Sequence, residues 1–543
     1  MSELTGLSAL IIEPNANMRA SIHNMLNLCG LTRIEHASGS NAAVRLVSAH
    51  AFDVILCEYD LDGGQDGQQL LEDMRHHKLI TQSTMFFMVT AEGNAGKVTS
   101  AAELVPSDYI LKPFTADRLL ERIARSLDKR DAFMPVYQLM EVGDQRAAID
   151  ACQLAMREHP RYAVDFLRLR AELHMVLGEP AEAEPIYQQV FDLRQVGWAR
   201  LGVAKTLFMR QRYPEAQELL EALIENNPKF VDAYDWLART HAAIGALEKA
   251  QSTLSEAVAV SPHAVRRLRR LGEVALETGD TDTAEKILKQ VVSKAKYSEF
   301  RDPEDHVKLV QTLVKKGDPV QAAAVIRDLD KSMGGQRNTG VCSAISSAMV
   351  HEYTGNEARL AESLATALAG CKESQGLSSE VKMELARNCL QNNMEEGASE
   401  VMREVMRNAP NNAAMTKAMS VFEKAGRGDL ASTIAQESRQ AVVELVAAGA
   451  LKAKEGDYRG AVTLMVEAVN KLPDNPQVVF NAAVAVLKCL ENMGWEERLG
   501  QYALSLIDTV RRLDPVNPKL PALAGLHQQI LKKYDKGTRA KKA

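Results

Sequence analysis

An alanine recurs through the middle of this 543-residue chain at a nearly constant interval. The successive steps are 35, 33, 34 and 34 residues, and they separate Ala148, Ala183, Ala216, Ala250 and Ala284. A proline stands twelve residues after one such alanine, at Pro228, and a glycine five residues before another, at Gly245; other units repeat these offsets. A fixed period of this size is typical of stacked repeats, because one unit alone cannot bury its apolar face. The period therefore predicts an array of helical units instead of a single compact core.

Each recurring position has a mechanical reason. Glycine suits the left-handed residue that ends a helix, and a small alanine lets two helices cross closely. Proline cannot continue a helix but fits the first turn of the next one. The composition agrees, since aromatic residues make up only 5% of the chain, whereas sandwiches and barrels need many aromatic and β-branched strand residues. Antiparallel helix pairs are the predicted unit.

One unit carries the whole pattern, AYDWLARTHAAIGALEKAQSTLSEAVAVSP at Ala233–Pro262, and residues 197–228 come close to it. The pattern resembles the tetratricopeptide-repeat (TPR) family. That resemblance implies an all-α superhelical solenoid of roughly ten helical-pair repeats over residues 129–519. We expect a capping helix at 520–531 and a basic, disordered tail at 532–543.

The first 128 residues follow a different pattern, in which short apolar runs alternate with amphipathic segments of helix length. The apolar runs cover residues 9–12, 34–37, 54–57, 86–89 and 109–111. The amphipathic segments cover residues 17–28, 41–50, 68–76, 96–104 and 115–127. Alternation in units this short predicts a parallel sheet with helices on both faces. In such a sheet, functional side chains lie at the carboxyl ends of the strands.

Those strand ends carry Glu13 and Pro14 after the first run, Glu58 after the third, Thr90 after the fourth and Lys112 after the fifth. The surrounding segments are LIIEPNANMR, DVILCEYDLDGGQDG, MVTAE and DYILKPF. Together they resemble the CheY-like receiver domain of bacterial response regulators.

The resemblance covers residues 1–128 and implies an α/β receiver with a doubly wound five-stranded parallel sheet. It makes Glu58 the phospho-acceptor position, and it makes Glu13 and Pro14 the acidic pocket. It also implies that Thr90, Tyr109 and Lys112 form the switch.

Two of these positions depart from the family pattern. Glu58 stands where receivers carry an aspartate, which moves the carboxylate out by one methylene, and Pro14 offers no side-chain oxygen to Mg²⁺. We therefore expect no phosphotransfer and no bound cofactor, with Mg²⁺ binding doubtful. Either Glu58 lies near Lys112 and imitates the phosphorylated state, or the receiver is a degenerate docking module. A third alternative is that Asp60 or Asp62 accepts phosphate instead.

The first helices of stacked TPR units line a concave groove, so the family pattern also selects candidate partner-binding residues. These are Asp235, Arg239, Arg266, Arg270, Glu273 and Arg387. Arg266 and Arg270, four positions apart, share one helix face. Because guanidinium groups match carboxylates, an acidic segment of a protein partner is the functional interpretation. The alternative interpretation is an ordinary solvated face.

Charge and motifs exclude several other classes. The net charge of −6 gives the chain as a whole no nucleic-acid-binding character, and its seven cysteines are scattered without a CxxC pair. No phosphate-binding loop, HExxH or GxSxG motif is present, so we predict no enzyme and no metal site. No apolar run approaches the length of a membrane span. We expect a cytoplasmic protein.

Three classes of function remain. We favour a cytoplasmic signalling adaptor that binds protein partners through its groove and carries a receiver that is not phosphorylated. The first alternative is a two-component response regulator that a histidine kinase phosphorylates and whose output is TPR-mediated binding. The second alternative is a nucleic-acid-binding regulator that uses the basic tail.

Overall fold

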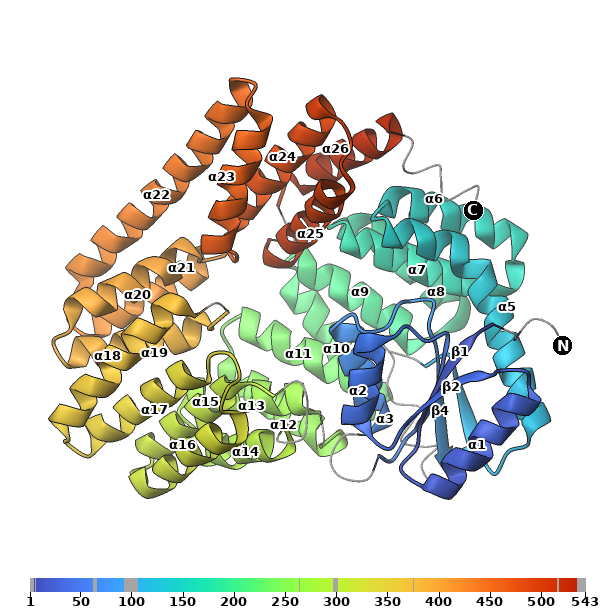
Figure 1. Cartoon of the computed structure of the whole chain (residues 1–543), viewed down its shortest axis with the longest axis horizontal. Coiled ribbons are helices and arrows are strands. Elements are labelled where there is room, and N and C mark those ends of the chain that lie inside the picture. The colour runs from blue at the N-terminus through green and yellow to red at the C-terminus, as the bar shows by residue number, and fades with distance from the viewer. Residues whose placement is uncertain are drawn as a thin grey trace. The chain divides into compact units, whose positions relative to one another are not determined.

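The computed structural model gives the chain's architecture (Figure 1). It describes residue 4 and residues 6–61, 66–91, 106–262, 264–295, 301–374, 376–514 and 517–534. The chain divides into two compact units, one that extends to Arg301 and one that begins at Asp302, apart from two short segments near residues 143 and 177 that group with the second unit. Each unit has its own apolar clusters.

The first unit begins with a sheet of five parallel strands in the order β2-β1-β3-β4-β5. The strands are β1 (Ser8–Ile12), β2 (Arg33–Ala37), β3 (Val54–Glu58), β4 (Met85–Ala91) and β5 (Asp108–Lys112). All five predicted strands are confirmed. Because every strand runs the same way, the carboxyl ends of β1, β3, β4 and β5 meet at one edge.

Helices cover both faces of this sheet. On one face Ile11 and Phe87 pack with α1 (Ala16–Leu28) and α5 (Ala116–Glu141). On the other face Leu10 and Phe86 pack with α2 (Ser40–Ala49) and α3 (Gly67–His76). Strands that are buried on both faces need apolar residues at consecutive positions, which explains the unbroken apolar runs. The helix predicted at 96–104 lies outside the described residues.

Helix α5 is longer than predicted. The segment expected to end at residue 127 continues to Glu141, and Pro135 lies inside it. The helix continues because its apolar face continues: Phe133 is buried and stacks on Phe166, with ring centroids 3.9 Å apart. Position 128, the expected domain boundary, therefore lies inside one continuous helix. The domain division stays a prediction.

Helical pairs follow in the rest of the first unit, with a short 3₁₀ turn at Pro160–Tyr162. They are α6 (Gln145–Glu158), α7 (Ala163–Val176), α8 (Pro180–Arg194), α9 (Gly197–Met209), α10 (Tyr213–Asn226), α11 (Val231–Ala243), α12 (Leu247–Val260), α13 (Val265–Thr278) and α14 (Thr281–Ala295). All five recurring alanines are fully buried, as close helix crossing requires. Gly245 and Gly279 have φ of +80° and +83°, the left-handed conformation predicted for helix ends.

The second unit continues in the same way. Its helices are α15 (Pro303–Lys315), α16 (Pro319–Met333), α17 (Thr339–Tyr353), α18 (Glu357–Glu373), α19 (Ser379–Gln391), α20 (Glu395–Arg407), α21 (Asn412–Lys424), α22 (Gly428–Lys454), α23 (Tyr458–Lys471), α24 (Pro476–Met493), α25 (Glu497–Leu513) and α26 (Leu520–Lys533). Helix α22 is 27 residues long.

The last helix packs against the helices that precede it. In α26, Leu520, Leu523 and Ile530 join the apolar cluster formed by α23, α24 and α25. The helix continues past residue 531 to Lys533, whose ammonium donates to the carbonyl of Glu491. The bounds of the capping helix and of the tail stay predictions. Residues 535–543 of the tail lie outside the described residues. Among the described helices, none combines the length and the apolar character needed to cross a membrane.

Candidate functional site

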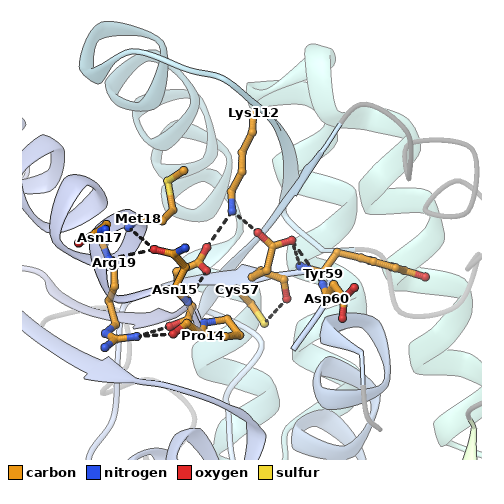
Figure 2. A network of polar contacts seen from close by, with 11 residues as sticks. Pro14, Asn15, Asn17, Met18, Arg19, Cys57, Tyr59, Asp60 and Lys112 are labelled. Atoms are coloured by element: carbon orange, nitrogen blue, oxygen red, sulfur yellow. Dashed lines mark hydrogen bonds and ion pairs between the residues drawn. The ribbon is translucent and has the colours of Figure 1, made fainter. Parts of the chain in front are cut away.

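The carboxyl edge of the sheet holds a cluster of one amine and two carboxylates (Figure 2). Lys112 ends β5, Glu58 ends β3, and Glu13 directly follows β1. The Lys112 Nζ atom lies 2.8 Å from Oε2 of Glu13 and also forms an ion pair with Oε2 of Glu58. The side chains of Glu13, Glu58 and Lys112 are 4%, 11% and 19% exposed. We call these three residues the strand-end triad.

The second oxygen of Glu58 is engaged as well. Its Oε1 accepts hydrogen bonds from the backbone amides of Tyr59, at 2.9 Å, and Asp60, at 3.3 Å. The chain can turn this tightly because Gly67 comes back beneath it and donates its amide to the Tyr59 carbonyl at 2.7 Å. A Cβ atom at Gly67 would lie 2.5 Å from the Glu58 carbonyl oxygen, so only glycine fits there. Both oxygens of the Glu58 carboxylate are therefore held.

The turn after β1 is held by a residue that the sequence analysis did not select. Arg19, in the first turns of α1, donates Nη1 to the carbonyls of Glu13, at 2.5 Å, and Pro14, at 3.1 Å. Asn15 caps α1 by accepting from the Asn17 amide, and its own amide donates to Glu13 Oε1 at 2.9 Å. The sequence signal that could have identified Arg19 is its position, as a basic residue one turn into the helix that follows β1.

Lys112 keeps its charge at neutral pH. Burial lowers the pKa of Lys112, but its hydrogen bonds to Glu13 and Glu58 outweigh burial, and the net pKa is raised. Burial together with the nearby Glu58 charge raises the pKa of the adjacent Cys57 thiol well above its usual value. Cys57 is therefore a neutral core residue, and a nucleophilic thiolate is absent from this position.

The donor set does not fit the Mg²⁺ ion that a receiver implies. Mg²⁺ requires near-octahedral oxygen ligands. Here the Lys112 ammonium lies between the carboxylates of Glu13 and Glu58, Pro14 has no side-chain oxygen, and the Pro14 carbonyl accepts from Arg19. A cation already compensates both carboxylates, so these residues do not form a site for a second one.

The remaining receiver positions lie on the neighbouring strands. Thr90 is fully buried in β4, and Tyr109 is half-buried on β5, where it packs against the apolar cluster beneath α2 and α3. Burial, with a smaller contribution from Tyr59, raises the pKa of Tyr109 to about 12. The switch roles of Thr90 and Tyr109 stay predictions. Asp60 is exposed, and Asp62 lies outside the described residues.

A second feature of the first unit is a cavity of about 540 Å³ between α11 and α13, which we call the arginine cavity. Five of the six predicted groove residues line it: Asp235, Arg239, Arg266, Arg270 and Glu273. Arg387 does not. It lies on α19 in the second unit and pairs with Glu384, one turn away on the same helix.

Charges in the arginine cavity are unevenly paired. Arg267, which the sequence analysis did not select, binds Asp235 through both Nε and Nη2, at 2.8 and 2.7 Å. Arg270 lies 3.4 Å from Glu273. The Arg239 guanidinium stacks over Trp236, 4.7 Å from the ring centroid, and burial together with Arg266 and Arg270 lowers its pKa despite Asp235. Arginine dominates this part of the groove.

Comparison with known proteins agrees with both regions. Residues 9–124 match the response regulator receiver domain, and residues 207–270 match the tetratricopeptide repeat. The chemotaxis protein CheY of Pseudomonas aeruginosa is 28% identical over 123 residues, which cover 23% of this chain and 98% of that protein. CheY-3 of Vibrio cholerae serotype O1 is 26% identical over 123 residues, which cover 23% of this chain and 93% of that protein.

Solved structures include a tetratricopeptide repeat protein from Parabacteroides merdae, with 15% sequence identity and a TM-score of 0.31. The match covers 47% of this chain and 96% of that one. From the family matches, the chain carries a receiver domain and TPR repeats, which are modules of signalling and protein interaction.

Proposed function

We propose that this protein is a signalling adaptor whose receiver works without phosphate and whose array binds an acidic segment of a protein partner. The observation that carries the proposal is the strand-end triad. Glu58 brings a permanent negative charge to the phospho-acceptor position, and Lys112 is already bound to it. This charge imitates the phosphorylated state.

Phosphoryl transfer to Glu58 is disfavoured on three grounds. An attacking carboxylate oxygen must come within about 3–3.5 Å of phosphorus and in line with the leaving group. One oxygen of Glu58 is bound to Lys112, and the other accepts two backbone amides. Freeing either oxygen leaves a half-buried charge without its partner, and the donor set for Mg²⁺ is missing.

The test is incubation of the full chain with acetyl phosphate and Mg²⁺, followed by intact-mass measurement. We expect no species heavier by one HPO₃ group. The matched control is the double variant Pro14→Asp with Glu58→Asp, which restores the residue types of the family and should gain that mass. Phosphorylation of the unmodified chain would contradict the proposal and favour the kinase-controlled response regulator; its site, by peptide mapping, would distinguish Glu58 from Asp60 or Asp62.

The binding part of the proposal depends on the arginine cavity. Two guanidinium groups there, those of Arg239 and Arg266, have no carboxylate within 4 Å among the described residues. Arginine binds carboxylates in paired hydrogen bonds, and an aromatic platform such as Trp236 holds the guanidinium flat. An acidic peptide segment is the partner that this chemistry favours.

A further inference from the structure

One acidic residue that lines the arginine cavity comes from the receiver. Glu72, on α3, lines the cavity together with Asp232 and Asp235 of α11 and the arginines of α13. Helices α3, α11 and α13 belong to the same compact unit. The receiver therefore places a carboxyl group in the part of the groove that an acidic partner would use.

Glu72 is held there weakly. Gln68, one turn earlier on α3, donates a long hydrogen bond of 3.5 Å to its carboxyl group. Arg267 donates two hydrogen bonds to Asp235, from Nε and Nη2. Within the described residues Glu72 has no ion pair, and burial with the nearby Asp232 raises its pKa to about 7 although Arg267 acts in the other direction. The receiver's carboxyl group is thus poorly compensated.

The cavity retains an excess of positive charge even with Glu72 present. Arg239 and Arg266 lack a carboxylate within 4 Å among the described residues, and they repel each other and Arg270. A flexible segment with several carboxylates can pair with these groups in geometries that a single glutamate on a fixed helix cannot reach. Charge complementarity therefore favours a multiply acidic peptide over Glu72.

We infer that helix α3 of the receiver and an acidic partner segment compete for the arginine cavity, so that the receiver restricts access to the groove until a partner displaces α3. This inference rests on the proposed binding function and adds its regulation.

The test uses the full chain and a fluorescein-labelled peptide of alternating aspartate and glutamate, with the asparagine–glutamine version as the neutral control. Peptide affinity is measured by fluorescence anisotropy, and amide hydrogen exchange of residues 67–76 is followed with and without saturating peptide. We expect peptide to speed exchange in α3. Glu72→Gln should lower the peptide Kd about two- to fivefold, because it removes a carboxylate that repels the acidic peptide. Asp73→Asn is the matched control, since it removes the same charge from the next position, which does not line the cavity.

The outcomes separate the two proposals. If the peptide binds but exchange in α3 stays constant or slows, the competition is wrong and the binding function survives. Equal changes in Kd for Glu72→Gln and Asp73→Asn would also overturn it, because they would reflect net charge alone. If neither the unmodified chain nor Glu72→Gln distinguishes the acidic peptide from the neutral one, the binding function itself is wrong.

Discussion

The strand-end triad and the arginine cavity differ in how their charges are compensated. In the triad, one lysine satisfies two carboxylates, and backbone amides complete Glu13 and Glu58. In the cavity, arginines outnumber the acids that line it. Burial lowers the pKa of Arg239, with Arg266 and Arg270 acting in the same direction, and burial together with Asp232 raises the pKa of Glu72. A cluster in which each charge has an opposite partner stabilises local structure. A cluster with an excess of cations favours a ligand that supplies the missing negative charge.

The largest expected effect comes from removing the cation of the strand-end triad. Lys112→Met leaves two carboxylates, 4% and 11% exposed, without their cation. We expect the free energy of opening of β1 and β3 to fall by about 3 kcal/mol. Native-state hydrogen exchange of those strand amides measures it. Lys129→Met, which removes a pair with Asp165 in which both side chains are nearly half exposed, should cost less than about 1 kcal/mol. Equal effects of the two variants would mean that the two carboxylates of the triad do not depend on Lys112 for their stability.

The second effect concerns the buried ammonium group of Lys205, near the cavity. Lys205 lies 5.4 Å from the Trp236 ring centroid, and burial lowers its pKa to about 8. The folded state therefore binds fewer protons than the unfolded state between about pH 8 and 10.5, and stability should rise with pH across that window.

Below pH 8 the folded chain bears the cost of the buried ammonium. Lys205→Met should therefore raise the free energy of unfolding at pH 7 by about 2 kcal/mol, after the lost contact with Trp236 is subtracted, and the gain should shrink above pH 8. Urea unfolding followed by tryptophan fluorescence measures it. Lys229→Met, at an exposed position, is the control and should show no such trend. A gain that is independent of pH would contradict the assignment.

The smallest effect in free energy concerns the ligand. Arg266→Glu with Arg270→Glu reverses two charges that line the cavity and should weaken acidic-peptide binding by at least about tenfold. The melting temperature should fall by only a few degrees, since both side chains lie at the surface of the groove. The matched control is Arg157→Glu with Arg161→Glu, an exposed pair with the same spacing. Unchanged binding would remove the cavity from the partner site.

Topology explains which parts were predictable. The strand-end residues Glu13, Glu58 and Lys112 could be grouped from the sequence, because parallel strands bring their carboxyl ends to one edge whatever the details of packing. The helical period was equally readable, since Gly245 and its equivalents act through local backbone conformation. Arg387 shows the limit: a repeat position predicts a groove-lining helix, but it does not predict which elements line one cavity.

The missed residues depend on contacts between elements that have no local signature. In the sequence, Glu72 is one more polar position on the exposed side of an amphipathic helix. Its place beside the residues of α11 and α13 that line the cavity depends on tertiary packing. Arg19 binds carbonyl groups, which every residue has. Helix α22 has 27 residues and extends well beyond the length of a single repeat helix. Its Gly449 accommodates the Met465 side chain.

The continuity of α5 has a mechanical consequence. Its 26 residues form a rod about 39 Å long, whose first half is anchored in the sheet by Leu119 and Ile123 and whose second half is anchored by Phe133 and Val136. No flexible tether separates the receiver from the first helical pairs, so rotational diffusion should report one body there instead of two. A tilt of α5 at the sheet would therefore move the helices that pack against its second half.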